Sequence, residues 1–230
     1  MKILGIIPAR KGSKGILNKN IKILGSDPLI SYTIESCKKA KLLENFIVST
    51  DSNEIAKISK KYGASVPFLR PSKLATDKSK SIDLVIHAIN FFEKKNTYYD
   101  AICLLQATCP FRDKNLIDDA IRKFKKNNFQ SLISVLPIPH QYNPYWAFKK
   151  ENDFLRSVID IGEIISRRQD LPQTFYRDGS IYITRVETVK TGTFYGETIG
   201  YIENSSDFHV NIDTETDWIN AELIAKEIKK

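Results

Sequence analysis

Short apolar segments alternate with segments of helical apolar spacing, and this alternation restricts the fold more than any other feature of the sequence. The apolar segments have the length and composition of buried strands. They span residues 2–8, 46–49, 66–69, 101–105 and 131–136. The helical segments span residues 28–41, 53–62, 81–95 and 114–126. Strands that alternate with helices of about 10–15 residues form βαβ units. We therefore expect an α/β fold with three layers and a mostly parallel sheet.

The regular alternation stops at residues 137–178, where prolines and aromatic residues are frequent. An irregular stretch of this length inside a compact domain is usually functional or forms an interface. A strand is expected again at 179–185 and a closing helix at 216–229. A chain of 230 residues with 42% hydrophobic side chains can bury one substantial core. We therefore expect residues 1–230 to form a single domain, with 137–178 as an insertion.

The chain carries a formal net charge of +8, which favours anionic partners. Many lysines occur as pairs beside helical segments, such as Lys38-Lys39 and Lys125-Lys126. Pairs of this kind usually form a solvated helix face rather than a nucleic-acid surface. Small phosphorylated or carboxylated molecules are therefore the expected partners, and no nucleic acid is expected.

Cys37, Cys103 and Cys109 have neither the spacing of a metal site nor the even number of a disulfide framework. This pattern indicates a reducing compartment. The first apolar segment is interrupted by Pro8 and Arg10, which makes it too short for a signal peptide, and no run of about 18 apolar residues occurs elsewhere. We therefore expect a cytoplasmic protein without a membrane segment.

A basic, glycine-containing loop follows the first expected strand and is the strongest candidate for a functional site. It runs from Ala9 to Asn20 with the sequence ARKGSKGILNKN. Open α/β sheets bind ligands at the carboxyl ends of their strands. Gly12 and Gly15 let the backbone approach a ligand, free amides can hold phosphate oxygens, and basic side chains neutralise their charge. The spacing matches neither a Walker A sequence nor GxGxxG. A plain solvated turn is the competing interpretation, but the density of basic residues at a strand end favours a phosphate loop.

The stretch IIPARKGSKGILNKN resembles the signature of the acylneuraminate cytidylyltransferases, the synthetases of CMP-sialic, CMP-legionaminic and CMP-pseudaminic acids. Motifs similar to those of this family follow in the same order: VSTDS, LRP with LATD, LQATCPFR, RQDLP, DGSIYI and IDTE. The resemblance covers nearly the whole chain. It implies a Rossmann-like nucleotidyltransferase fold with a dimerisation arm at 137–178. It also implies an enzyme that joins a nine-carbon acidic sugar of the sialic-acid type to CMP, with CTP as donor and pyrophosphate as product.

The resemblance further implies roles for individual residues at the nucleotide. Arg10 and Lys19 match family positions that hold the triphosphate, and Asn20 matches a position near the nucleotide. Arg70 and Ala75 match the stretch that lines the cytosine pocket. The residues that accompany Arg10 and Lys19 in the loop are Ala9, Gly12 and Ser13.

A second group of residues is implied at the sugar and the metal. Gln106 and Gly179 match sugar-side positions, and Arg168 matches a basic residue that binds the sugar carboxylate from the partner subunit of a homodimer. Asp213 matches a metal ligand, with Mg²⁺ as the expected ion and Mn²⁺ as an alternative. A hard cation that bridges phosphates needs few protein carboxylates. Spacing alone would make Asp213 a helix cap, whereas the resemblance favours the metal.

Three departures from the family pattern concern the metal site and the sugar side. Sialic-acid enzymes often have Asp-x-Asp where this chain has Asn211-Ile212-Asp213. Asn211 is therefore a candidate metal ligand that offers a carbonyl oxygen but no charge. The turn that tends to read Arg-Pro-Asn-Gly contains Asp178 in place of the amide. Ala107 and Cys109 replace Pro and Ser beside Gln106, which we interpret as a packing difference.

The mechanism that the resemblance implies is an in-line attack of the anomeric hydroxyl of the sugar on the α-phosphorus of CTP. Two alternatives remain open. One is a cytidylyltransferase for the eight-carbon sugar Kdo, or another sugar nucleotidyltransferase of the same layout. The other is a non-catalytic nucleotide-binding regulator that kept the loop and lost the metal site. The presence of Asn211 in place of an aspartate is the reason to retain this alternative.

Overall fold

A six-stranded sheet forms the centre of the molecule in this computed structural model, which describes residues 1–12, 15–204 and 207–228. The strand order is β10-β6-β9-β5-β1-β4. The strands are β1 (Ile3–Pro8), β4 (Asn45–Ser49), β5 (Ala101–Leu104), β6 (Ser131–Pro137), β9 (Phe175–Arg185) and β10 (Ile199–Glu203). The β1–β4, β1–β5 and β6–β10 pairs are parallel, and only β9 runs antiparallel to its neighbours. The expected α/β fold with a mostly parallel sheet is therefore confirmed.

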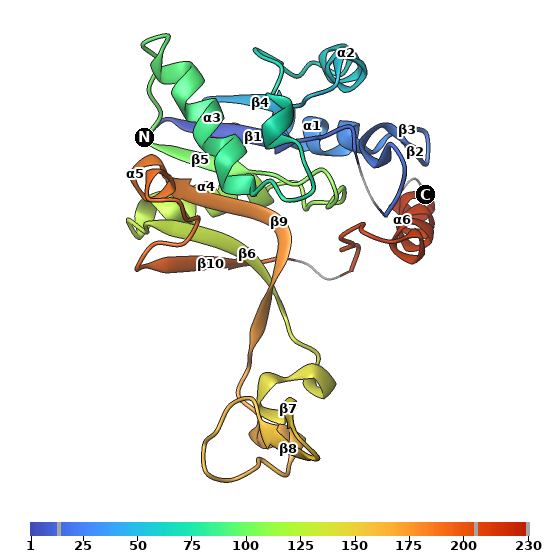
Figure 1. Cartoon of the computed structure of the whole chain (residues 1–230), viewed down its shortest axis with the longest axis vertical. Helices are drawn as coiled ribbons and strands as arrows, with labels where there is room; N and C mark the ends of the chain where they lie inside the picture. The colour runs from blue at the N-terminus through green and yellow to red at the C-terminus, as the bar shows by residue number, and fades with distance from the viewer. Residues whose placement is uncertain (13–14, 205–206, 229–230) are drawn as a thin grey trace.

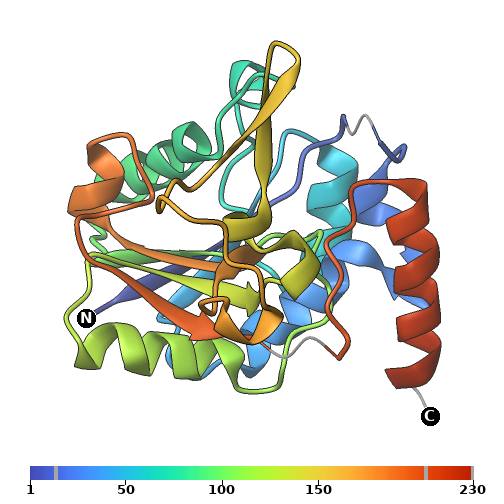
Figure 2. The ribbon, with the colours of Figure 1, turned by 90° about the horizontal axis from the view of Figure 1, so that it is seen from below.

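Helices cover both faces of this sheet (Figure 2). They are α1 (Leu29–Lys39), α2 (Asn53–Lys61), α3 (Ser81–Glu93), α4 (Leu116–Lys126), α5 (Val186–Lys190) and α6 (Glu215–Ile228). Ile3 and Ile7 of β1 share a core with α1, α2 and α4, whereas Leu4 and Ile6 share a second core with α3 and α5. Side chains of a strand alternate between its two faces, so β1 can be apolar throughout only because both faces are covered.

Helix α6 lies apart from these two layers, beside a small hairpin (Figure 1). The hairpin consists of β2 (Ile23–Leu24) and β3 (Asp27–Pro28). Trp218 of α6 packs with Leu24, Leu29 and Ile16 in a third core, which also buries Ile212. This packing brings the end of the chain to the loop that follows β1.

The expected strand at 66–69 is wrong. Only two isolated bridges form there, Ile47 with Ser65 and Thr50 with Leu69. Pro67 has no N–H to donate, which prevents a continuous ladder along this edge. Strand β10 and helix α5 were not expected from the sequence, and β9 begins earlier than the expected 179–185.

An arm projects from the sheet between β6 and β9 (Figure 1). The two strands continue side by side beyond the sheet and carry residues 138–174 at their end. The arm contains three short 3₁₀ turns, at His140–Tyr142, Pro144–Trp146 and Arg168–Asp170, and the hairpin of β7 (Phe148–Glu151) and β8 (Phe154–Ser157). It exposes large apolar side chains, namely Tyr142, Phe148, Phe154, Leu155, Val158, Ile161 and Ile164. The arm coincides with the irregular stretch at 137–178, apart from the last residues, which belong to β9.

Within the described ranges, no helix has both the length and the apolar character that crossing a membrane requires.

Candidate functional site

The loop after β1 and the segment before α6 meet at the carboxyl end of the sheet. A Cβ atom on Gly15 would lie 2.1 Å from the carbonyl oxygen of Asp213, so this approach requires glycine. The Lys19 ammonium donates to the Ile212 carbonyl at 2.5 Å and pairs with Asp213 Oδ1 at 3.1 Å. Lys19 and Asp213, which the resemblance assigns to the phosphates and the metal, are thus in direct contact. Ser13 lies outside the described residues.

Arg10 faces the same space from the start of the loop. Its guanidinium pairs with Asp77 Oδ1 at 2.8 Å and donates to the Ala75 carbonyl at 3.5 Å. The Asn20 amide donates to the Arg10 carbonyl at 3.0 Å and so fixes the backbone of the loop. Arg10, Asn20 and Ala75, to which the resemblance assigns roles at the nucleotide, are therefore in contact with one another through Arg10. Asp77 was missed as a site residue, although it stands in the quoted LATD motif.

Arg70 is a buried cation on the wall of this space, with only 4% of its surface exposed. Its guanidinium donates to the carbonyls of Ser49 at 3.2 Å and Leu74 at 3.4 Å. Its Nε is buried and has no hydrogen-bond partner among the described residues. Burial lowers the pKa of Arg70, and Arg10 adds to this, while Asp51 opposes it. A buried guanidinium with a spare donor suits an acceptor atom of a ligand.

These residues surround one basic cavity of about 280 Å³. The predicted residues in its lining are Arg10, Gly12, Lys19, Asn20, Arg70 and Asp213. The lining residues that sequence analysis missed include Thr76, Asp77, Ser79, Ser81 and Thr108. Thr76, Asp77 and Thr108 stand in the quoted motifs LATD and LQATCPFR, whereas Ser79 and Ser81 carry no signal that separates them from ordinary surface residues. Cations and hydroxyl groups around a cavity at the ends of parallel strands suit a polyphosphate.

The predicted sugar-side residues form a second cluster beside the cavity. Thr108, which lines the cavity, donates to Gln106 Oε1 at 3.3 Å. Gly179 has a φ of +85°, and a Cβ at this position would lie 3.2 Å from Cys109 Sγ and 3.7 Å from Asn211 Nδ2. The left-handed conformation and the close thiol both favour glycine. Gln106, Gly179 and Asn211 thus adjoin the cavity through the Thr108 segment.

Among the predicted site residues that the structure describes, Arg168 lies apart from the cavity and the cluster beside it. It is exposed in the arm and takes no part in the lining of the basic cavity. The neighbouring Arg167 forms an ion pair with Asp170 at 2.7 Å. Within one chain, Arg168 therefore lies away from Gln106 and Gly179, the other residues that the resemblance assigns to the sugar.

Asp213 does not cap α6, which removes the interpretation that spacing alone favoured. Asp217 accepts from the amides of Asp213 at 3.0 Å and Thr214 at 2.8 Å, and the Thr214 hydroxyl accepts from the Asp217 amide. This reciprocal arrangement is a capping box. Burial raises the pKa of Asp217, but these hydrogen bonds outweigh it and the net shift is downward. The Asp213 carboxylate is therefore left for other partners, and 68% of its side-chain surface is exposed.

The residues present fit a divalent cation of the Mg²⁺ kind. The described part of the chain contains no group of three or more His, Cys, Asp or Glu side chains that would enclose a metal. Asp213 instead offers one carboxylate at the edge of a cavity suited to phosphates. Mg²⁺ commonly binds through one or two carboxylates together with substrate phosphates and water.

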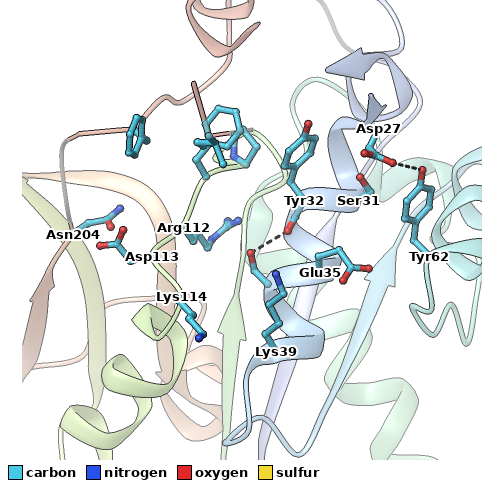
Figure 3. A pocket seen from close by; sticks show the side chains of 15 residues that line it. Asp27, Ser31, Tyr32, Glu35, Lys39, Tyr62, Arg112, Asp113, Lys114 and Asn204 are labelled. Carbon is cyan, nitrogen blue, oxygen red and sulfur yellow. Dashed lines mark hydrogen bonds between the residues drawn. The ribbon is translucent and has the colours of Figure 1, made fainter. Parts of the chain in front are cut away.

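A larger cavity of about 690 Å³ lies on the α1 side of the sheet (Figure 3). It contains none of the predicted site residues, and acidic side chains (Asp27, Glu35 and Asp113) offset its cations. Tyr62 donates to Asp27 at 3.0 Å across one side. Charge thus favours the smaller cavity as the phosphate site.

The three-layer fold, with a basic cavity at the carboxyl ends of its strands, defines a nucleotide-binding α/β protein of the nucleotidyltransferase type. Comparison with known proteins identifies the family. The cytidylyltransferase profile matches residues 4–226, and the chain belongs to this family.

Several relatives support this assignment. The chain is 37% identical over 234 aligned positions to CMP-N,N'-diacetyllegionaminic acid synthase of Legionella pneumophila, covering 97% of this chain and 96% of that protein. It is 34% identical to pseudaminic acid cytidylyltransferase of Campylobacter jejuni over 79% of this chain and 78% of the relative. It is also 34% identical to N-acylneuraminate cytidylyltransferase of Escherichia coli over 93% of this chain, but it spans only 51% of that longer protein.

Solved structures support the fold. CMP:2-keto-3-deoxy-manno-octonic acid synthetase in complex with CTP superposes with a TM-score of 0.74 at 15% identity, covering 99% of this chain and 100% of the other. The 4-diphosphocytidyl-2C-methyl-D-erythritol synthase of Anaerococcus prevotii superposes with a TM-score of 0.68 at 11% identity, covering 100% of this chain and 99% of the other.

Proposed function

We propose that this chain transfers CMP from CTP to a nine-carbon acidic sugar of the sialic-acid type and releases pyrophosphate. The observation that carries the proposal is the contact of Lys19 with Asp213 in a cavity that Arg10 and Arg70 also line. The relatives support the sugar class, because the names of three of them include legionaminic, pseudaminic or acylneuraminic acid. A reaction that consumes CTP also fits the expected cytoplasmic location.

The proposed reaction is one in-line displacement. The anomeric hydroxyl oxygen forms a bond to the α-phosphorus, the bond from that phosphorus to the bridging oxygen of the pyrophosphate breaks, and the hydroxyl proton is lost. Such a transfer depends mainly on positioning and on neutralising phosphate charge. Arg10 and Lys19 would bind the phosphates, and Arg70 would lie at the cytosine base. Among the loop amides, that of Gly12 would hold a phosphate oxygen, because the amides of Ala9 and Lys11 already donate to the Ser49 carbonyl and to Asp51. Mg²⁺ held by Asp213, with Asn211 as a possible second oxygen donor, would supply further charge neutralisation, and Mn²⁺ has the same ligand preference.

The sugar can be identified by a pyrophosphate-release assay with CTP and one acid at a time. We expect turnover with legionaminic, pseudaminic or N-acetylneuraminic acid and much slower turnover with Kdo. Faster turnover with Kdo would favour the eight-carbon alternative. CTP binding without pyrophosphate release for any of these acids would favour the non-catalytic regulator and contradict the proposal.

The arm is proposed to form a homodimer and to bring Arg168 to the sugar side of the partner's site. Two features support this: the arm exposes a group of large apolar side chains, and Arg168 lies away from the cavity of its own chain. Contiguous exposed apolar surface commonly marks a protein interface.

Complementation between two inactive variants tests whether Arg168 acts across the dimer. Arg168→Ala and Asp213→Ala are expected to be nearly inactive alone. In a mixed dimer, one site would combine Asp213 of one subunit with Arg168 of the other, so random co-expression should restore about a quarter of the parent activity. The control is a mixture of the two separately purified variant dimers under conditions in which they do not exchange subunits. An absence of recovery in purified mixed dimers would show that Arg168 does not act in trans.

A further inference from the structure

Strand β9 contains a bulge with a buried carboxylate that the proposed reaction does not use. The pairing of β6 with β9 shifts between Ile133 and Val135, so that residues 178–181 face Ser134 alone. Asp178 lies in this bulge and is only 2% exposed. Bulges beside active sites commonly redirect side chains. A buried carboxylate is costly unless it is hydrogen-bonded, so its contacts show which parts of the chain it joins.

Asp178 joins three segments. Its Oδ1 accepts hydrogen bonds from the Ser134 hydroxyl of β6 and from the Ser180 amide of the bulge at 3.0 Å. Its Oδ2 accepts from Asn204 Nδ2 at 2.6 Å. Its backbone carbonyl accepts from His209 Nε2 at 2.9 Å. Asp178 and His209 are 31 residues apart in the chain, so this contact forms only in the folded protein.

His209, which donates to the Asp178 carbonyl, belongs to the described segment 207–213 that also carries the proposed metal ligand. After His209 the chain continues to Asn211, which contacts Cys109, and to Ile212, whose amide donates to the Thr108 carbonyl at 2.9 Å. Asp213 follows and meets Lys19. Residues 209–213 are therefore held at both ends: His209 donates to the Asp178 carbonyl, and Asp213 pairs with Lys19.

Arg112 supports the same bulge from the side of the larger cavity. Its guanidinium donates to the carbonyls of Gln106 at 2.6 Å and Ser180 at 3.1 Å. Arg112 and Asn204 both lie in the wall of that cavity (Figure 3). Arg112 and Asn204 thus contact the segments around Gln106 and Asp178, which carry the sugar-side cluster.

We propose that Asp178 is a positioning residue for this reaction, which holds residues 207–213 so that the Asp213 carboxylate faces Lys19 and the phosphates. Its carboxylate fixes the bulge to Ser134 and Asn204 and so sets the position of its backbone carbonyl, which accepts from His209. Asp178 touches neither substrate. Groups that orient a metal ligand commonly change metal affinity or activity by about 10- to 100-fold when they are removed. The expected effect on turnover rests on the proposed function, whereas the expected effect on residues 207–213 does not.

The test compares Asp178→Ala with Asp178→Asn and with a control, Asp118→Ala. In Asp178→Asn, the side-chain oxygen at 178 can still accept from Ser134 and Ser180. The new NH₂ group can donate to the side-chain oxygen of Asn204 if the Asn204 amide rotates by 180°. Asp118 is a buried carboxylate of α4 that accepts from the amides of Lys41 and Leu42. The control therefore loses comparable hydrogen bonds at a place that has no contact with residues 207–213.

Three measurements are made: amide hydrogen exchange of residues 207–213, kcat and KM for CTP, and the Mg²⁺ concentration for half-maximal rate. Asp178→Ala should speed the exchange, lower kcat and raise the half-maximal Mg²⁺ concentration, each by about 10-fold or more, with the KM for CTP within about twofold. Asp178→Asn should stay close to the parent. Asn204→Ala should reproduce the faster exchange, and it replaces Asp178→Ala if that variant does not fold.

The proposal is overturned if folded Asp178→Ala exchanges residues 207–213 at the parent rate, or if Asp118→Ala changes kcat and the Mg²⁺ requirement equally. It is also overturned if Asp178→Asn is as impaired as Asp178→Ala, because hydrogen bonding would then not be the cause. If the parent chain transfers no CMP to any acidic sugar, the proposed function fails, and hydrogen exchange still decides whether Asp178 holds this segment.

Discussion

Replacing Arg10 with alanine should reduce CMP transfer by about 10² to 10³ in rate, which corresponds to about 3–4 kcal/mol of lost transition-state stabilisation. The Arg10 guanidinium points into the basic cavity, where it pairs with Asp77 at 2.8 Å. When a triphosphate binds, this cation would face the phosphates whose charge increases as pyrophosphate leaves. Steady-state pyrophosphate release with saturating CTP and sugar measures the change.

The fold should tolerate Arg10→Ala, because an ion pair between partly exposed side chains contributes only about 0–1 kcal/mol to the free energy of unfolding. Arg122→Ala is the matched control, since Arg122 forms a similar surface pair with Asp119 on α4, away from the cavity. A rate within about threefold of the parent for Arg10→Ala would remove Arg10 from the phosphate site.

Replacing Asp213 with alanine is expected to have an effect of similar size, about 10² to 10³ in rate, and to raise the Mg²⁺ concentration needed for activity. Asp213 is the acidic residue in contact with Lys19, and its carboxylate is largely exposed at the edge of the cavity. Because the capping box of α6 uses Thr214 and Asp217, the helix should keep its N-terminus in this variant. Pyrophosphate release measured over a range of Mg²⁺ concentrations tests both effects.

Glu215→Ala is the control for Asp213→Ala, because Glu215 lies two residues further on and pairs with Lys22 at 3.5 Å. It should leave the rate and the Mg²⁺ dependence unchanged. An unchanged Mg²⁺ dependence in Asp213→Ala would show that this carboxylate does not bind the metal. Equal losses in both variants would point to a general disturbance at the start of α6.

The regular part of the fold was predictable because its signals are local. Segment 2–8 is apolar on both faces, which only a strand covered by two layers tolerates, and β1 is such a strand. The prediction failed at 66–69, where Pro67 removes the donor that a ladder needs. The direction of β9 was not predictable, since strand direction depends on the path of the arm that precedes it.

The candidate site was predictable where a motif carries several residues together. The loop from Ala9 to Asn20 concentrates basic side chains and glycines directly after a strand, and this pattern alone indicated phosphate binding. The carboxylate of Asp77 gave no comparable signal, because its partner Arg10 is distant in the sequence. The network around Asp178 was missed for the same reason.

The α/β class, the phosphate loop and the resemblance to the cytidylyltransferases could be predicted from the amino-acid sequence, because each depends on residue types at short spacing. Three features became visible only in the folded chain: Lys19 contacts Asp213, Thr214 and Asp217 rather than Asp213 cap α6, and Arg168 lies away from the cavity of its own chain. These contacts join segments far apart in the chain, and they arise when α6 packs on the β2–β3 hairpin and the arm leaves the sheet. Their geometry depends on that packing, which no local pattern encodes.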